Sequence, residues 1–172
     1  MDLDREFTKG WNVETLRYYS SATHKMIGIE SHNGQAELDS IGENGRNLTF
    51  AVLSMNRADN IRLMRSIAEQ MPEFEGEFLI GDNGSSDDQL DMLYDFCEKV
   101  PYRCRILEFK KNYGVAAGRN KLFKEVQTEW IIAVDNDVYF VGNPLKKIQQ
   151  DICQLGCHFM CLPTINQEHY DT

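Results

Sequence analysis

The sequence predicts an α/β fold: a mostly parallel sheet with helices on both faces. From Leu48 onward, short apolar runs rich in strand formers alternate with segments whose apolar residues recur at helical spacing. Strands that alternate with helices in this way are joined by right-handed crossovers, which make the sheet parallel. The chain has 172 residues, 42% of them hydrophobic and 26% charged, so it is long enough for one sizeable core.

Five short apolar segments bounded by polar residues are predicted as strands. They are LTFAVLSM (48–55), EFLIGD (77–82), RCRILEF (103–109), WIIAVD (130–135) and CHFMCLP (157–163). The first two of these segments and the last are predicted to be buried strands.

Four helices are predicted between and after these strands, at about 61–71, 86–100, 115–126 and 145–155. Pro72 closes the first helix, because proline cannot continue it. Ser86 caps the second helix, and the two aspartates after it favour the N-terminal end of the helix dipole.

The chain divides at about residue 47. Within residues 1–47, segment 15–30 is compatible with a helix or a hairpin, and segment 31–47 is polar and rich in Gly and Asn, as a linker is. We therefore predict an N-terminal extension of unknown role over 1–47 and an α/β domain over 48–172.

Charge and composition exclude several classes of partner. The net charge of −9 disfavours binding to nucleic acid or to anionic lipid, since both need a basic face. No apolar run approaches the roughly 20 residues that cross a bilayer, so no transmembrane segment is expected. The N-terminus lacks the pattern of a secretory signal, which predicts a cytoplasmic location.

The five cysteines are an odd number, and in that compartment they are expected to be reduced thiols. Cys153, Cys157 and Cys161 have a spacing that zinc sites use, and two histidines follow. Cys157 and Cys161 would share one face of a predicted strand, which favours small buried thiols over a zinc site.

Polar residues follow the first four predicted strands. They are SMNR (54–57), DNGSSD (82–87), NYGVAAGRN (112–120) and DND (135–137). In an open parallel sheet, ligands bind beyond the carboxyl ends of the strands. Four such ends on one edge describe a single site better than four unrelated turns.

Asp135 and Asp137 are a candidate cation site. In an extended backbone their side chains leave on the same side, and two carboxylates that close repel unless a proton or a cation intervenes. Mg²⁺ or Mn²⁺ takes one or two carboxylates and completes its shell with water and phosphates. One alternative is a turn with solvated acids. The other is an acid/base pair for glycoside hydrolysis, to which adjacent strand positions are poorly suited.

The glycine-rich stretch after the third strand is neither a dinucleotide fingerprint nor a P-loop. Its spacing is Gly114-x-x-x-Gly118, and no Lys-Ser or Lys-Thr follows the glycines. A helix start at this point, with Arg119 and Lys121 in its first turns, suits a diphosphate. The alternative is that the glycines allow close packing and that Arg119 is a surface residue.

Taken together and in order, these four motifs resemble those of the family-2 glycosyltransferases of the GT-A fold. The resemblance covers about residues 48–163. It implies a GT-A-type, Rossmann-like three-layer sandwich, and it makes residues 48–172 the nucleotide-sugar-binding portion.

The resemblance also implies roles for individual residues. Asp82 would accept a hydrogen bond from the base, Arg119 would approach the diphosphate, and Asp135 would approach the ribose or sugar hydroxyls. Asp137, with Asp135, would bind the Mn²⁺ or Mg²⁺ that bridges the phosphates. The nucleotide-binding set it implies is Ser54, Asn56, Arg57, Asp82, Asn83, Gly114, Arg119 and Asp135.

We therefore expect metal-dependent, inverting transfer of a sugar from a nucleotide-diphosphate sugar, with a UDP-sugar favoured. The sequence does not identify the acceptor, for which a saccharide, a lipid-linked glycan and a protein are the classes considered. No motif marks Glu168, His169 or Asp171 as a catalytic base. Either the chain is part of a longer protein, which we expect, or another chain supplies the rest. The alternatives are a nucleotidyltransferase, whose glycines are missing after the first strand, and a non-catalytic nucleotide-sugar-binding module.

Overall fold

The computed structural model describes residues 41–56 and 59–155, together with four two-residue strands nearer the N-terminus. The chain forms two compact units, one of Asp39–Gln149 and the other of Met1–Leu38 with Gln150–Thr172. Three predicted features lie outside the described residues. They are Arg57, the strand predicted at 157–163, and the tail residues Glu168, His169 and Asp171. The predicted domain limits, 1–47 and 48–172, remain predictions.

The N-terminal strands pair as a hairpin does. β1 (Thr15–Leu16) runs antiparallel to β4 (Ile29–Glu30), and β2 (Tyr19–Ser20) runs antiparallel to β3 (Lys25–Met26). The inner pair is nested within the outer one. Of the two forms with which segment 15–30 was compatible, the structure has the hairpin.

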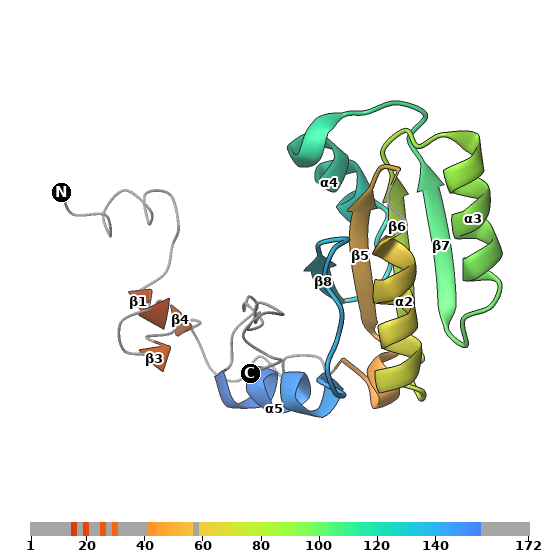
Figure 1. The fold of residues 1–172 in the computed structure, drawn as a ribbon. Helices are drawn as coiled ribbons and strands as arrows, with labels where there is room; N and C mark the ends of the chain where they lie inside the picture. The colour runs from red at the N-terminus through yellow and green to blue at the C-terminus, as the bar shows by residue number, and fades with distance from the viewer. Residues whose placement is uncertain are drawn as a thin grey trace, which may run out of the picture. The chain divides into compact units, whose positions relative to one another are not determined.

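The larger unit contains a parallel four-stranded sheet with the order β7-β6-β5-β8 (Figure 1). Its strands are β5 (Leu48–Ser54), β6 (Glu77–Asp82), β7 (Arg103–Glu108) and β8 (Trp130–Val134). Its helices are η1 (Glu43–Gly45), α2 (Asp59–Gln70), α3 (Asp87–Cys97) and α4 (Gly114–Lys124). A further helix, α5 (Leu145–Leu155), begins in this unit and ends beyond its limit at Gln149. In the part of the chain that is described, no helix is long and apolar enough to cross a membrane. The predicted α/β fold is confirmed.

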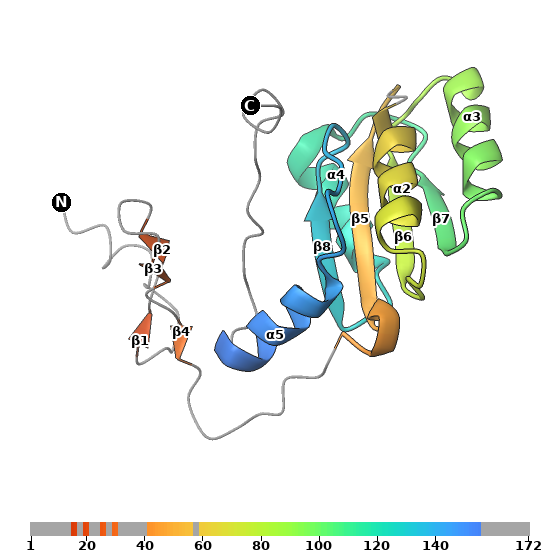
Figure 2. The ribbon, with the colours of Figure 1, turned by 60° about the horizontal axis from the view of Figure 1, so that its bottom comes forward.

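The order of the strands explains which helix covers which face. The chain passes from β5 to β6 to β7 in one direction and then returns to the far side of β5 to form β8. Because each crossover is right-handed, this reversal places α4 on the face opposite α2 and α3. Figures 1 and 2 show α2 and α4 on opposite sides of the sheet.

Aromatic side chains fill the core beneath α2. The ring centroids of Phe50 and Phe74 lie 5.1 Å apart, and those of Phe74 and Tyr102 lie 5.7 Å apart. The Tyr102 hydroxyl donates a hydrogen bond of 2.7 Å to the carbonyl oxygen of Met64, so its one polar group is satisfied although the residue is buried.

A smaller core lies beneath α4. Ala51, Leu79 and Leu122 are buried there. Gly118 allows the helix to approach this closely, since a Cβ at that position would lie 2.8 Å from Cδ2 of Leu53. The structure therefore shows the packing role for this glycine that the sequence left as an alternative.

The fourth strand is less buried than its apolar sequence predicts. Ile131 is 39% exposed and Ala133 is also exposed. Among the described strands β8 stands at one edge of the sheet, and α4 packs on β5 and β6 instead. An apolar run cannot distinguish an edge strand from a central one.

Two cysteines depart from the expectation of reduced thiols. The structure joins Cys97, the last residue of α3, to Cys104 in β7 as a disulfide, with Cα atoms 5.4 Å apart. The tight α3–β7 connection brings them together, which an odd count of cysteines does not reveal. Of the proposed thiol cluster at 153–161, only the backbone of Cys153 is described.

Candidate functional site at the carboxyl edge of the sheet

The carboxyl ends of the four strands meet at one edge, where the topology reverses. Ser54 at the end of β5 lies level with Asp82 at the end of β6, and Val52 lies level with Val134 at the end of β8. The chain leaves β5 for α2 on one face of the sheet and leaves β7 for α4 on the other. Such a reversal opens a crevice for a ligand beyond the strand ends.

Asp82 organises the loop that follows β6. The residue is only 2% exposed, and its carboxylate accepts backbone N–H bonds of 3.2 Å from Gly84 and from Ser85. Gly84 has φ of +93°, and a Cβ there would lie 2.9 Å from the carbonyl carbon of Lys111. A glycine is therefore required for the loop to close around this carboxylate.

Asn83 ties the β6 loop to the start of α4. Its Oδ1 accepts the backbone N–H of Tyr113 at 2.9 Å, and its Nδ2 donates to Oδ1 of Asn112 at 3.0 Å. The same Asn112 oxygen accepts the backbone N–H of Gly114 at 2.7 Å. Two asparagine side chains thus fix the first turn of the helix that carries Arg119.

Asn56 ties the β5 loop to the β6 loop. Its backbone N–H donates to Oγ of Ser85 at 2.9 Å, and its Oδ1 accepts the backbone N–H of Ser86 at 2.8 Å. The backbone of Asn56 has φ of 50°, a left-handed conformation that asparagine tolerates better than most residues.

Ser54 is buried at the end of β5. It is 2% exposed, and its hydroxyl accepts a hydrogen bond from Nδ2 of Asn60 in the first turn of α2. Its hydroxyl therefore supports the start of α2 instead of lining an open surface.

Arg119 and the two aspartates after β8 form the other half of the edge. The Arg119 guanidinium makes an ion pair with the Asp135 carboxylate, with side-chain exposures of 38% and 65%. Asp137 is exposed and makes no ion pair within the described residues. Gly114, five residues before Arg119, starts α4 with φ of +72°.

Asp135 and Asp137 fit a hard divalent cation that takes its remaining ligands from a bound substrate and from water. In the described ranges, no group of three or more His, Cys, Asp or Glu residues could hold a metal by itself. Asp137 and Asp135 offer two carboxylates at most, which is the share that protein supplies when substrate phosphates and water complete the shell of Mg²⁺.

Three charged or polar side chains form a rim at the end of β7. The Tyr94 hydroxyl donates to Glu108 at 2.7 Å, which raises the pKa of Tyr94 to about 12. Lys110 forms an ion pair with the same carboxylate, and this pair, with the Tyr94 bond, lowers the pKa of Glu108. The carboxylate thus stays ionised and engaged at neutral pH.

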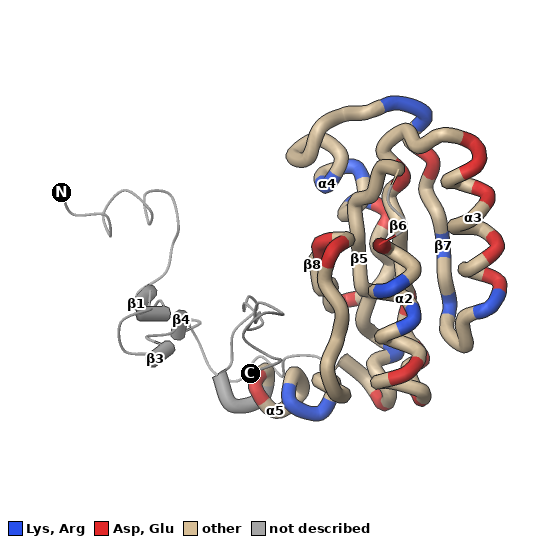
Figure 3. The backbone as a smooth tube through the Cα atoms, in the orientation of Figure 1, with Lys and Arg blue, Asp and Glu red and all other residues tan. Residues whose placement is uncertain are grey.

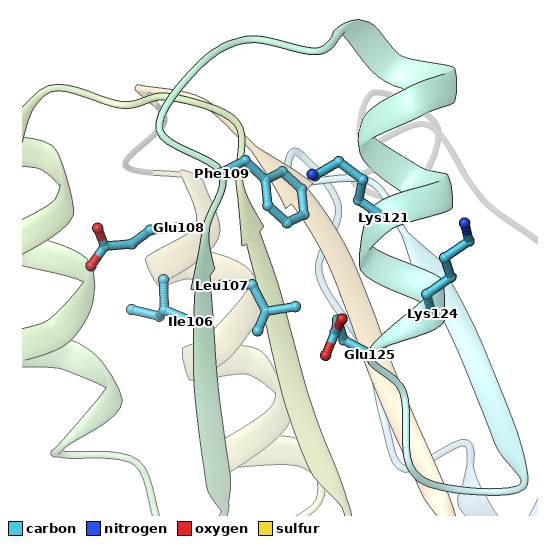
Figure 4. A pocket seen from close by; sticks show the side chains of 7 residues that line it. All are labelled: Ile106, Leu107, Glu108, Phe109, Lys121, Lys124 and Glu125. Carbon is cyan, nitrogen blue, oxygen red and sulfur yellow. The ribbon is translucent and has the colours of Figure 1, made fainter.

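A cavity of about 540 Å³ lies beside β7, outside the predicted site (Figure 4). Leu107 and Phe109 line it from β7 and its end, and Lys121 and Lys124 line it from α4. Of the two basic side chains that the sequence suggests for a diphosphate, Lys121 lines this cavity and Arg119 does not, and none of the predicted nucleotide- and metal-binding residues lines it. The predicted site is instead an open edge.

Sequence reasoning did not assign roles to Asn112, Ser85 or Asn60. Asn112 and Ser85 stand inside the motifs that mark the strand ends, and that position was the available signal. Asn60 stands outside those motifs, and only the folded geometry shows that it reaches Ser54.

The fold defines the chain as an α/β protein with a parallel sheet whose topology reverses at this polar edge. The family model of glycosyl transferase family 2 matches residues 49–169, well over half of the chain. The chain therefore belongs to glycosyl transferase family 2.

Solved structures confirm the GT-A fold. TarS of S. aureus is 25% identical with a TM-score of 0.51, over 62% of this chain and 19% of that one. TarS 1–349 in complex with UDP-GlcNAc is 22% identical with a TM-score of 0.55, over 68% of this chain and 37% of that one. A third structure is mannosyltransferase PcManGT from Pyrobaculum calidifontis in complex with GDP-Man and Mn²⁺. It is 20% identical with a TM-score of 0.50, over 57% of this chain and 29% of that one.

The chain spans well under half the length of each of these solved proteins. No curated protein matches it.

Proposed function

We propose that the chain is the donor-binding part of a glycosyltransferase that uses a nucleoside-diphosphate sugar and a divalent cation. The proposed transfer inverts the configuration at the anomeric carbon. The observation that carries the proposal is the Arg119–Asp135 ion pair beside the exposed Asp137, at the edge where the topology reverses. The printed complexes of the similar structures, with UDP-GlcNAc and with GDP-Man and Mn²⁺, support this choice of donor class and cation.

Asp82 and Asn83 are proposed to form the base and ribose end of the site. Both are nearly buried and are fixed by several hydrogen bonds, so a base would meet an ordered surface. The Asp82 carboxylate already accepts two backbone N–H groups, and its oxygens have lone pairs left to accept an N–H of a base. Asn56 and the 82–86 loop would border the same surface.

Arg119 is proposed to bind the diphosphate. A guanidinium presents paired donors that match phosphate geometry, and the first turn of α4 adds backbone N–H groups. In the structure Arg119 is held by Asp135, so an arriving diphosphate would either share the guanidinium with that carboxylate or displace it.

Asp137 is proposed as the main protein ligand of the cation, with Asp135 beside it. A bound Mg²⁺ or Mn²⁺ would offset the charge that develops on the departing diphosphate. The chain's own share of that stabilisation comes from Arg119, whose positive charge is already in place before the sugar–phosphate bond breaks.

The transfer itself is proposed as a single displacement. The oxygen of an acceptor hydroxyl bonds to the anomeric carbon as the bond from that carbon to the diphosphate oxygen breaks. The electron pair leaves with the nucleoside diphosphate, and the hydroxyl proton passes to a base.

Calorimetric titration of the chain with UDP, GDP and uridine tests the proposal, each in Mn²⁺, in Mg²⁺ and in chelator. We expect one diphosphate to bind in Mn²⁺ and to lose at least tenfold in affinity in chelator, while uridine binding is the same in both. Equal affinity of the diphosphates in cation and chelator would contradict the proposal. Release of pyrophosphate from a nucleoside triphosphate and a sugar phosphate would favour a nucleotidyltransferase instead.

A further inference from the structure

We propose that Ser66 and Gln70 of α2 are positioning residues for the cation site, because they hold the chain segment that follows Asp137. This inference rests on the proposed function, and it adds two residues that touch neither the donor nor the cation. Both act through the backbone of segment 139–142.

The two aspartates stand in a connection without helix or strand. β8 ends at Val134, and the next element, α5, starts at Leu145. A connection of this kind is mobile unless other parts of the molecule bind it. A carboxylate on a mobile connection would hold a cation poorly, since coordination tolerates little displacement.

Ser66 binds the segment through a buried hydroxyl. Its Oγ accepts the backbone N–H of Phe140 at 3.0 Å and donates to the carbonyl oxygen of Leu63 at 2.7 Å. Ser66 is 6% exposed, so water has little access to its hydroxyl. Removing the hydroxyl would therefore leave the N–H of Phe140 without its hydrogen-bond acceptor.

Gln70 binds the segment one helical turn further along α2. Its Oε1 accepts the backbone N–H of Gly142 at 2.9 Å. Gly142 has φ of +80°, a conformation that favours glycine and directs the chain back toward α5. Phe140 and Gly142 are therefore both fixed to the same helix.

Side chains of the segment add to these two bonds. The Arg62 guanidinium lies 3.9 Å from the centroid of the Tyr139 ring, and the Phe140 ring lies 5.1 Å from that of Phe50. Between α2 and the segment there is also a cavity of about 240 Å³, lined in part by Arg65 and Glu69. The segment is thus attached at separate points, with Ser66 and Gln70 as its hydrogen-bond acceptors from α2.

The fixed backbone at Val134 and Phe140 limits the positions that Asp137 can occupy. Val134 in the sheet lies on one side of the aspartates and Phe140 on the other, so only residues 135–139 span the gap. If the bond to Ser66 is lost, the next amide fixed by α2 is that of Gly142, so the span grows to residues 135–141 and Asp137 samples more positions. Loss of the bond to Gln70 alone leaves Phe140 fixed and frees only the far end of the segment. Outer partners of metal ligands typically change metal affinity by about 10- to 100-fold.

The test compares Gln70→Ala and Ser66→Ala with the parent chain, by titration with UDP in Mn²⁺ and in chelator. Glu69→Ala is the matched control, because Glu69 lines the same cavity and forms no hydrogen bond with the segment. Gln70→Glu is the conservative variant that keeps an acceptor oxygen. Hydrogen exchange of the Phe140 and Gly142 amides reports directly on the two bonds.

We expect Ser66→Ala to weaken UDP binding in Mn²⁺ about tenfold and to leave binding in chelator unchanged. Gln70→Ala should have a smaller effect of the same kind. Exchange of the Phe140 amide should accelerate in Ser66→Ala and that of the Gly142 amide in Gln70→Ala, and Gln70→Glu and Glu69→Ala should behave as the parent does. A loss that is equal in Mn²⁺ and in chelator, or no loss in Ser66→Ala, would overturn the inference while the proposed function stands. A parent chain without any cation dependence would overturn both.

Discussion

The guanidinium of Arg119 and the carboxylate of Asp135 form an ion pair between α4 and the residue that follows β8. The side chains are 38% and 65% exposed, and ion pairs this exposed contribute about 0–1 kcal/mol to stability. The pair therefore matters less for stability than for geometry. It places a cationic group and an anionic group together at the edge where the topology of the sheet reverses.

Replacing Arg119 with alanine should reduce UDP affinity without unfolding the protein. The free energy of unfolding should change by at most about 1 kcal/mol, since the pair is exposed. UDP affinity should fall at least tenfold, because the diphosphate loses a bidentate partner, whereas uridine affinity should not change. Calorimetry and urea unfolding measure the two effects.

Arg103→Ala is the control for Arg119, because Arg103 is also exposed but begins β7 at the opposite end of the strands. It should bind UDP as the parent does. If Arg119→Ala also retains parental affinity, Arg119 does not bind the diphosphate.

Asn83→Ala should lower both stability and nucleotide affinity. The side chain is 5% exposed and makes hydrogen bonds of 2.9 and 3.0 Å, which leave partners unsatisfied when it is removed. We expect a loss of about 1–3 kcal/mol in the free energy of unfolding, measured in urea. Gln127→Ala, at an exposed position, should change stability by no more than about 0.5 kcal/mol. Equal stabilities would show that Asn83 does not link the two loops.

Glu77→Gln should reduce stability and leave nucleotide binding intact. Glu77 is 2% exposed at the start of β6, and it accepts two hydrogen bonds from Arg105, of 2.9 and 3.2 Å. Bonds between charged groups contribute about 1.5–3 kcal/mol, so a loss of this size is expected in urea unfolding. Glu75→Gln, nearby and exposed, is the matched control. A marked loss of UDP affinity in Glu77→Gln would mean that the two ends of the sheet are coupled.

Alkaline pH should destabilise the fold through two tyrosines. The hydrogen bond to Glu108 raises the pKa of Tyr94 to about 12, and burial raises the pKa of Tyr102. Tyrosines of the unfolded chain ionise near pH 10. The contribution of these two tyrosines to the free energy of unfolding is therefore complete below that pH, and it is lost as the pH rises toward their pKa values in the folded protein. The free energy of unfolding should therefore fall as the pH rises above about 10.

Urea unfolding between pH 8.5 and 11 checks this dependence. Tyr102→Phe should be less stable at pH 8.5, because the bond to Met64 is gone, and its stability should fall less steeply with pH. An unchanged slope in Tyr102→Phe would contradict the assignment.

The sequence predicted the sheet well, because a strand buried on both faces has a recognisable pattern. EFLIGD was predicted as a strand over 77–82, which are the bounds of β6, and all six of its residues are buried. β8 has a similarly apolar sequence but lies at the edge of the described sheet, and only the arrangement of the other elements shows this. The disulfide between Cys97 and Cys104 depends on the tight connection between α3 and β7, which the count of cysteines does not reveal.

The candidate site was predictable in place but not in detail. The end of β6 had to bring Asp82 to the carboxyl edge, since strand ends meet there in a parallel sheet. The Ser54 hydroxyl accepts a hydrogen bond from Asn60, six residues further along the chain, and no motif specifies that contact. The bonds from Ser66 and Gln70 to segment 139–142 join positions more than seventy residues apart. Motif spacing does not contain such information.

The position of a bound cation tests the central claim most directly. Crystals of the chain soaked with MnCl₂ and UDP should give an anomalous manganese peak about 2.1 Å from a carboxylate oxygen of Asp137, with phosphate oxygens completing the shell. The peak should be absent in Asp137→Ala crystals treated in the same way. A manganese peak bound elsewhere, or UDP bound away from Arg119 and Asp137, would contradict the account.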